Sequence, residues 1–229
     1  MKLHVVLLSA VCLLFGIFSV FSQDLIIEDG EKFIFNVTTG KGETYTSENQ
    51  FHVKKVNDYI LYSYTNEDEY EKWVVETAEN GVPTTIEFFT KGNETALTFH
   101  GNGDAEIHGF WSGKEINEKG SYSANVSLEN ALIVRTLDYS SKEKYAFDLL
   151  QTSKLPRLVA FPMYFKVLGK EEITVPAGTF SCVKVQFSLT DMRGLFYKAY
   201  YYISDDTHRY IVKIHNVPMG GETELVSIN

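Results

Sequence analysis

Hydrophobic and polar residues alternate with a period of two along most of this chain. In residues 32–37, for example, Phe33, Phe35 and Val37 fall on one face of an extended strand. Long stretches with the helical spacing i, i+3, i+4 and i+7 are nearly absent. The pattern predicts a protein built mainly from β-strands, because successive side chains of a strand point to opposite faces.

Turn-forming residues divide these stretches into two groups of strands. The first group is predicted at 32–37, 50–56, 59–64, 71–76, 84–89, 95–100 and 105–111. The second is predicted at 145–151, 160–174, 179–190, 195–204, 210–217 and 223–228. Short strands at this spacing indicate a mostly β fold, a curved antiparallel meander that forms a half-barrel, or unclosed barrel.

One segment between the two groups, residues 127–137, predicts a short helix. Leu128 and Leu132 stand at a helical spacing, and Ser127 is a suitable N-cap. β-Branched residues such as Ile133 also favour a strand, so that alternative stays open.

Two turns in the second half are specified by residue type. Pro176 supplies a φ near −65°, and Gly178 supplies a left-handed residue that can start a bulged hairpin. Asp191 and Gly194 repeat this arrangement, with a carboxylate able to accept the N–H groups of its own turn. We therefore expect Pro176, Gly178 and Gly194 to be structural turn residues.

The N-terminus predicts export. Lys2 precedes an apolar run over residues 3–21, and a junction of the type that signal peptidases recognise ends at Ser22. The alternative is a retained membrane anchor, because about twenty apolar residues can just span a bilayer. The junction favours cleavage, which makes residues 1–22 a signal peptide. Residues 23–229 would then form a single antiparallel β domain that is periplasmic or secreted.

The net charge and the number of cysteines limit which partners and which disulfides the mature chain can have. Without Lys2 the mature chain carries 20 basic and 30 acidic residues, a formal net charge of −10, which repels nucleic acid. Cys12 would leave with the signal peptide, so Cys182 has no internal disulfide partner. A small, part-buried apolar role for Cys182 is favoured over an intermolecular or reactive thiol.

No catalytic constellation can be recognised in the sequence. It has no phosphate-binding loop, no dinucleotide-binding glycine pattern and no nucleophile elbow. Its histidines do not stand at zinc-ligand spacing with cysteine or with one another. We therefore predict a protein that is not an enzyme and has no catalytic residues, metal site or cofactor.

The segment 195–204 is apolar on both faces when it is read as one strand. One face would carry Leu195, Tyr197, Ala199, Tyr201 and Ile203, and the other Phe196, Lys198, Tyr200 and Tyr202. Such a strand should be covered on both sides. Cross-strand aromatic packing in a thick core would explain the pattern. So would a cavity for an apolar ligand, with candidate ligand-binding residues Phe196, Tyr197, Tyr200 and Tyr201.

One hairpin carries a resemblance to a known family. Residues 175–185, Val-Pro-Ala-Gly-Thr-Phe-Ser-Cys-Val-Lys-Val, resemble the V-P-A-G-T-F-x-C-x-K-V signature of a bacterial periplasmic family of unknown function. Weaker similarities lie at 30–35, 202–206 and 209–214, and in the Ala-Leu-x-x-Arg pattern of Ala131, Leu132 and Arg135. The family often has a proline shortly after the arginine matched to Arg209, where this chain has Tyr210 and Ile211.

The resemblance implies the unclosed-barrel fold of the lipoprotein-localisation factors LolA and LolB, which hold lipid against a curved sheet. We therefore expect a non-catalytic cell-envelope protein that binds an apolar or lipid-like ligand in a half-barrel. One alternative is a structural or assembly protein that recruits an envelope partner through an exposed sheet edge. Another is a hydrolase or lyase built on the barrel.

Overall fold

The structure is a computed structural model, and it describes most of the chain after residue 27. The described residues are 28–56, 59–67, 71–77, 83–90, 93–100, 104–111, 113–121, 126–127, 134–135, 137, 139–140, 143–151, 159–218 and 220–229. The predicted signal peptide and Cys12 lie outside them.

Fifteen strands form one sheet in the described part of the chain. They are β1 (Lys32–Thr38), β2 (Thr44–Val56), β3 (Tyr59–Glu67), β4 (Glu71–Thr77), β5 (Pro83–Thr90), β6 (Asn93–Phe99), β7 (Asp104–Trp111), β8 (Lys114–Ser121), β9 (Val126–Ser127), β10 (Lys144–Gln151), β11 (Val159–Val175), β12 (Gly178–Leu189), β13 (Lys198–Ser204), β14 (Ile211–Asn216) and β15 (Gly221–Ile228). A short 3₁₀ helix, η1 (Met192–Leu195), joins β12 to β13.

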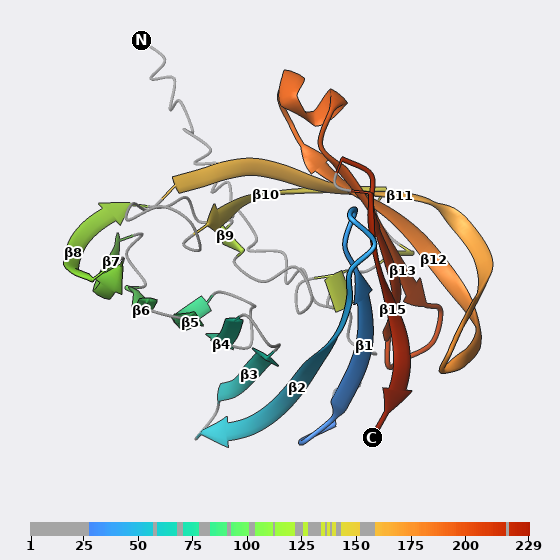
Figure 1. Ribbon diagram of the computed structural model, residues 1–229, viewed down its shortest axis with the longest axis horizontal. Helices are drawn as coiled ribbons and strands as arrows, with labels where there is room; N and C mark the ends of the chain where they lie inside the picture. Colours follow the sequence, from blue (N-terminus) through green and yellow to red (C-terminus); the bar gives the residue numbers. More distant parts are fainter. Residues whose placement is uncertain are drawn as a thin grey trace, which may run out of the picture.

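The sheet consists of two meanders joined at its centre. Its order is β8-β7-β6-β5-β4-β3-β2-β1-β15-β14-β13-β12-β11-β10-β9, so the first strand pairs with the last. All neighbours are antiparallel except the short parallel pair β9 and β10. The two edge strands, β8 and β9, are not paired with each other in this order, and the sheet curves without closing (Figure 1). The predicted unclosed antiparallel barrel is therefore confirmed.

The predicted helix at 127–137 needs correction at both ends. Ser127, its expected N-cap, belongs to strand β9, and Leu137 forms a β-bridge. Val134 and Arg135 are helical, while residues 128–133 lie outside the described residues. Pairing with β10 fixes the start of this segment as a strand, which local helix propensity could not reveal.

The predicted strand at 195–204 also begins too early. Leu195 lies in η1, and β13 begins only at Lys198. The two-residue alternation therefore applies from Lys198 onward. Strand β8 was not predicted, because its sequence is mostly polar, as an edge strand allows.

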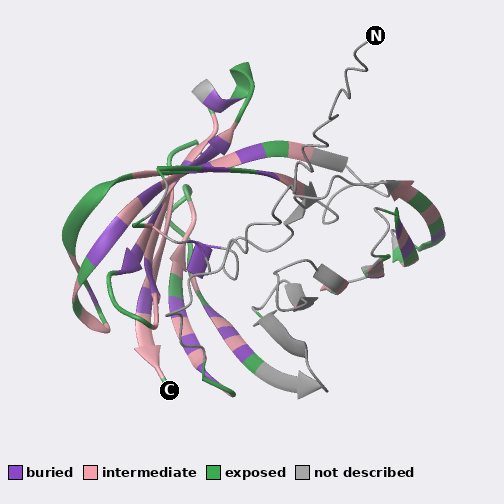
Figure 2. Cartoon of the chain, turned by 180° about the vertical axis from the view of Figure 1, so that it is seen from behind, coloured by how far each residue is buried: buried purple, intermediate pink, exposed green. Residues whose placement is uncertain are grey.

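Buried residues alternate with more exposed ones along the curved strands (Figure 2), so one face of the sheet, the inner face, carries the core. Four of the buried residues form a ladder across neighbouring strands, which we call the aromatic ladder: Phe147, Phe165, Phe187 and Tyr201. The ring centroids of Phe147 and Phe165 are 5.2 Å apart, and those of Phe165 and Phe187 are 5.1 Å apart. Cross-strand aromatic pairs of this kind stabilise a sheet beyond the area they bury.

Candidate functional site

The four predicted ligand-binding residues do not come together in the structure. Tyr201 lies on the inner face within the aromatic ladder and is only 6% exposed. Tyr197 is partly buried beside Phe187 on that face, with ring centroids 6.2 Å apart. Tyr200 points to the opposite, outer face, whereas Phe196 follows η1 and is 81% exposed.

The outer position of Tyr200 follows from its neighbours. Its ring stacks on that of His215, with a centroid separation of 6.4 Å, and the Lys184 ammonium lies 5.3 Å from its centroid. Sequence reasoning separated Tyr200 from Tyr201 correctly by alternation. It misplaced Phe196, because the chain is not extended before Lys198.

The structure also places the three predicted turn residues. Pro176 and Gly178 lie at the β11–β12 hairpin, where Gly178 has a φ of +136°. Asp191 accepts a hydrogen bond from the Arg193 backbone N–H at 2.9 Å, as expected for a carboxylate that caps its own turn. Gly194 has a different role from the one predicted, since an added Cβ would lie 2.2 Å from the Leu189 carbonyl oxygen. Close backbone approach, rather than a left-handed φ, requires glycine there.

A buried arginine lies on the inner face near the centre of the sheet, beside β1 and β2. The Arg135 guanidinium donates to both carboxylate oxygens of Glu31, at 2.8 and 3.1 Å, and to the His208 carbonyl oxygen at 2.8 Å. Arg135 is 0% exposed and Glu31 5%. We call these three residues the Arg135 cluster.

Aromatic rings surround the guanidinium of Arg135. Its central carbon lies 4.6 Å from the Phe51 ring centroid, 5.2 Å from that of Phe33 and 5.8 Å from that of Tyr210. Cation–π attraction and a bidentate carboxylate partner together compensate the loss of water around a buried charge. The short segment around residues 134–135 thus lies inside the curve, close to β1 and β2 (Figure 1).

The β13–β14 connection is shaped to hold this segment. Asp206 accepts from the backbone N–H groups of His208 and Arg209, at 2.9 and 3.0 Å, which folds the loop back on itself. The Arg209 side chain then donates to the Leu137 carbonyl oxygen, and its guanidinium lies 5.7 Å from the Tyr139 ring centroid. Arg135 and Leu137 are therefore tied to the sheet by the side chains of Arg135 and Arg209.

Sequence reasoning missed the function of Arg135. It placed this residue only in an Ala-Leu-x-x-Arg resemblance and assigned it no contact. An arginine in an otherwise apolar segment was the available signal, because a buried arginine needs a carboxylate partner. The partner, Glu31, stands 104 residues away and could not be chosen among thirty acidic residues.

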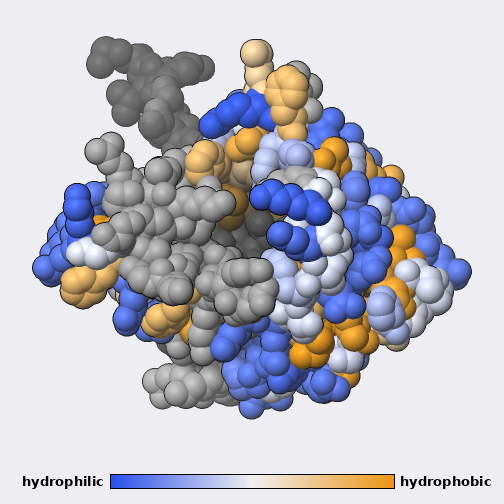
Figure 3. All heavy atoms as spheres, viewed as in Figure 1, coloured by the Kyte–Doolittle hydropathy of each residue, from blue (hydrophilic) through white to orange (hydrophobic). Residues whose placement is uncertain are grey.

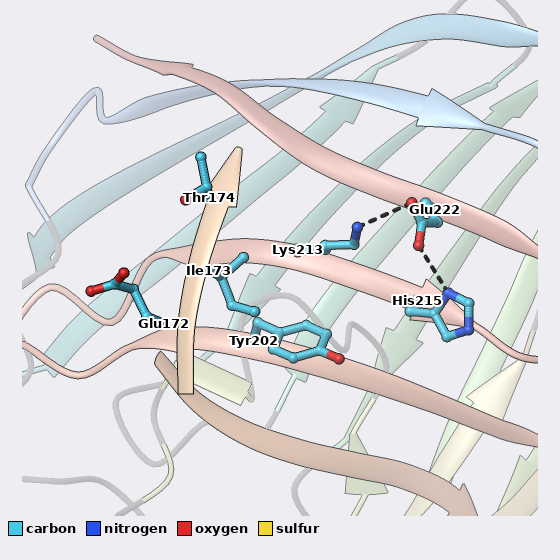
Figure 4. A pocket seen from close by; sticks show the side chains of 7 residues that line it. All are labelled: Glu172, Ile173, Thr174, Tyr202, Lys213, His215 and Glu222. Carbon is cyan, nitrogen blue, oxygen red and sulfur yellow. Dashed lines mark hydrogen bonds and ion pairs between the residues drawn. The ribbon is translucent and has the colours of Figure 1, made fainter. Parts of the chain in front are cut away.

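A small polar pocket of about 370 Å³ lies on the outer face (Figure 4). The end of β11, with Glu172, Ile173 and Thr174, crosses over β13, β14 and β15 at this pocket (Figure 4). The lining residues are Glu172, Ile173, Thr174, Tyr202, Lys213, His215 and Glu222.

The charged groups of this pocket are paired with one another. Lys213 donates to Glu222 at 3.0 Å and to Glu224 at 2.9 Å, and His215 Nδ1 lies 3.1 Å from Glu222. The hydrogen bond from Lys213 holds the pKa of Glu222 below its ordinary value, and the contact with His215 adds to this effect. The arrangement is a cross-strand charge network, with Ile173 and Tyr202 as the apolar part of the lining.

Cys182 is fully buried on β12. Burial raises the pKa of its thiol to about 12, with the nearby Asp206 and Glu171 as lesser causes. Because the thiolate is the reactive form, burial and the raised pKa both disfavour reaction of this thiol near neutral pH. The expected burial of Cys182 as a small apolar residue is confirmed, and it is complete rather than partial.

Two further observations concern the part of the chain that the structure describes. No group of three histidine, cysteine, aspartate or glutamate side chains there is arranged to hold a metal ion. No helix there has the length and hydrophobicity needed to cross a membrane.

No protein-family model matches the sequence, and a search of curated proteins gave no match. Among solved structures, the chain is similar to a β-barrel-like protein of the domain of unknown function DUF1849 from Brucella abortus. The two share 9% identity and superpose with a TM-score of 0.55 over 89% of this chain and 98% of that one. This likeness shows a shared fold.

Two looser similarities carry no weight for the fold. One is to a protein of YmcC-like fold from Bacteroides fragilis, described as exported, with a TM-score of 0.39, 13% identity and 90% and 98% coverage. The other is to a protein from Parabacteroides distasonis described as a lipoprotein, with a TM-score of 0.35, 14% identity and 92% and 99% coverage.

Proposed function

We propose that this chain is an exported, non-catalytic protein of the cell envelope that holds an apolar or lipid-like ligand against the inner face of its unclosed barrel. The observation that carries the proposal is the aromatic ladder. It forms a continuous apolar layer across four strands of a sheet whose edges do not meet. Its four side chains are 0–7% exposed, so a ligand would have to displace the part of the chain that packs over them. A curved apolar surface of this kind must be covered, and small barrels commonly use it to hold a ligand.

The Arg135 cluster supports the same proposal. It holds Val134 and Arg135 over the inner face near β1 and β2, whereas the ladder lies on β10 to β13. One part of the inner face is thus covered by a segment that polar bonds fix in place. The ladder is the apolar remainder of that face, and each methylene of a ligand that packs against it would contribute about 0.8 kcal/mol.

Ala199 provides the sharpest test, because it lies opposite Phe187 on the inner face and is 4% exposed. We expect the delipidated protein to bind a fluorescent fatty acyl probe saturably, and Ala199→Leu to weaken that binding while the protein stays folded. If the inner face is instead fully packed, Ala199→Leu costs about 1–3 kcal/mol of stability by overpacking. A melting temperature that falls accordingly, with no probe bound by the parent protein, would refute the proposal.

Tyr200→Leu is the matched control, because it changes the adjacent residue on the outer face. The proposal requires it to leave probe affinity unchanged. Equal losses from Ala199→Leu and Tyr200→Leu would show that the probe does not occupy the inner face.

Recruitment of a partner strand receives less support from the sheet edges. Strand β8 carries four charged residues, Lys114, Glu115, Glu118 and Lys119. Charged edge strands are a common means of preventing edge-to-edge pairing. Strand β9 has only two residues. The ligand-binding proposal is therefore preferred.

A further inference from the structure

The connection between β12 and β13 forms a projecting tip with exposed apolar side chains. We define the η1 tip as residues 191–196. Met192 is 82% exposed and Phe196 81%, which makes them the most exposed large hydrophobic residues in the described part of the chain. The tip extends beyond the sheet at the top of Figure 1, and apolar atoms gather at its end (Figure 3).

The η1 tip is held in one conformation by bonds at its base. The Ser188 hydroxyl contacts two carbonyl oxygens of the connection, that of Gly194 at 3.0 Å and that of Tyr197 at 2.7 Å. Asp191 caps η1 by accepting from the Arg193 backbone N–H. A connection built in this way presents Met192 and Phe196 without a large ordering cost on binding.

The charges at the η1 tip cancel. The Arg193 guanidinium donates two hydrogen bonds to Asp191 Oδ2, at 2.9 and 2.5 Å. It also lies 5.7 Å from the Phe161 ring centroid. No net charge therefore has to be removed from water when the end of the tip enters an apolar phase. The long Arg193 side chain can keep its guanidinium in the polar layer at the surface of that phase.

We propose that the η1 tip is a membrane-contact site, at which Met192 and Phe196 insert into the surface of an uncharged lipid bilayer. Two side chains are too few for a stable protein interface, which buries about 800 Å² on each partner, but they suit shallow insertion into lipid. The chain carries a formal net charge of −9, so anionic headgroups would repel it rather than add affinity. The proposal does not depend on whether the inner face holds a ligand.

Co-sedimentation of the mature protein with phosphatidylcholine vesicles tests this proposal. We expect the parent protein to sediment with the vesicles, with little dependence on salt. The double variant Met192→Ser/Phe196→Ser should lose about tenfold in partitioning for each side chain, the lower end of what burial of such residues contributes. Because both positions are exposed, the variant should fold and bind the acyl probe as the parent does.

Phe110→Ser is the matched control. Phe110 is 56% exposed on β7, in the other meander, so its replacement removes exposed apolar surface away from the tip. It should sediment like the parent protein. The proposal is overturned if the parent does not bind the vesicles, or if Phe110→Ser loses as much as the double variant. Self-association in the absence of lipid that disappears in the double variant would also overturn it, since a second copy would then be the occupant.

Discussion

Gly178 illustrates how one residue determines a hairpin. Its φ of +136° lies in a region that residues with a Cβ rarely adopt, and an added Cβ would meet only the Phe180 ring, at 3.8 Å. Space is therefore available, and backbone conformation alone requires glycine. Gly194 shows the opposite case, in which contact with the Leu189 carbonyl oxygen excludes any side chain.

We predict that Gly178→Val lowers the free energy of unfolding by about 1–3 kcal/mol, because a β-branched residue is strained at this φ. Urea or thermal unfolding of the purified variant measures the change. Ser181→Val, at an exposed position of the same strand, is the control and should change stability little. An unchanged midpoint for Gly178→Val would mean that the turn relaxes without cost.

At the scale of elements, the pairing of β14 with β15 aligns charges across the outer face. Lys213 stands opposite Glu224, and His215 opposite Glu222. Burial lowers the pKa of Lys213, but its hydrogen bonds to Glu224 and Glu222 outweigh that effect and raise it. The pair of Lys213 and Glu222 therefore stabilises β14 and β15 in the pH range between the lowered pKa of Glu222 and the raised pKa of Lys213.

The acidic end of this pH range gives a second prediction. Because the pKa of Glu222 is depressed in the folded protein, its contribution to stability is present above the ordinary carboxylate pKa and is lost as the pH falls through the lower folded value. We expect Glu222→Gln to be less stable than the parent at neutral pH and equally stable once the pH lies below the lowered folded pKa of Glu222, in urea titrations at each pH. A stability difference that persists in acid would assign the effect of the substitution to packing.

At the scale of the whole molecule, the Arg135 cluster connects three distant parts of the chain. Glu31 directly precedes β1, His208 lies between β13 and β14, and Arg135 lies between β9 and β10. Both partners of the ion pair are almost completely buried. Loss of one partner leaves the other charge buried and unpaired.

We therefore predict that Arg135→Met costs about 3–5 kcal/mol of unfolding free energy, and that the double variant Arg135→Met/Glu31→Leu recovers most of that loss. Chemical denaturation of the three proteins measures both effects. Arg135→Lys should recover less than the double variant, since lysine cannot bond both carboxylate oxygens in one plane. Additive losses in the double variant would show that the two residues do not act as a pair.

The sequence by itself determined the features that depend on near neighbours in the chain. Alternation of apolar and polar residues predicted most strands, and Pro176, Gly178 and Asp191 specified their turns, because strand faces and turn angles are set by local sterics and hydrogen bonds. The unclosed antiparallel barrel followed from these elements and from the resemblance.

Only the tertiary structure decided which distant segments meet. The pairing of β1 with β15 joins the two meanders, and Glu31 finds Arg135 across 104 residues. The tight turn at Gly194 moves Phe196 out of the strand and onto the exposed η1 tip, while Tyr201 enters the aromatic ladder. Such contacts depend on the relative positions of whole strands, and many partners with the same local pattern compete for each of them. For that reason the sequence predicted strands and turns, but neither the Arg135 cluster nor the η1 tip.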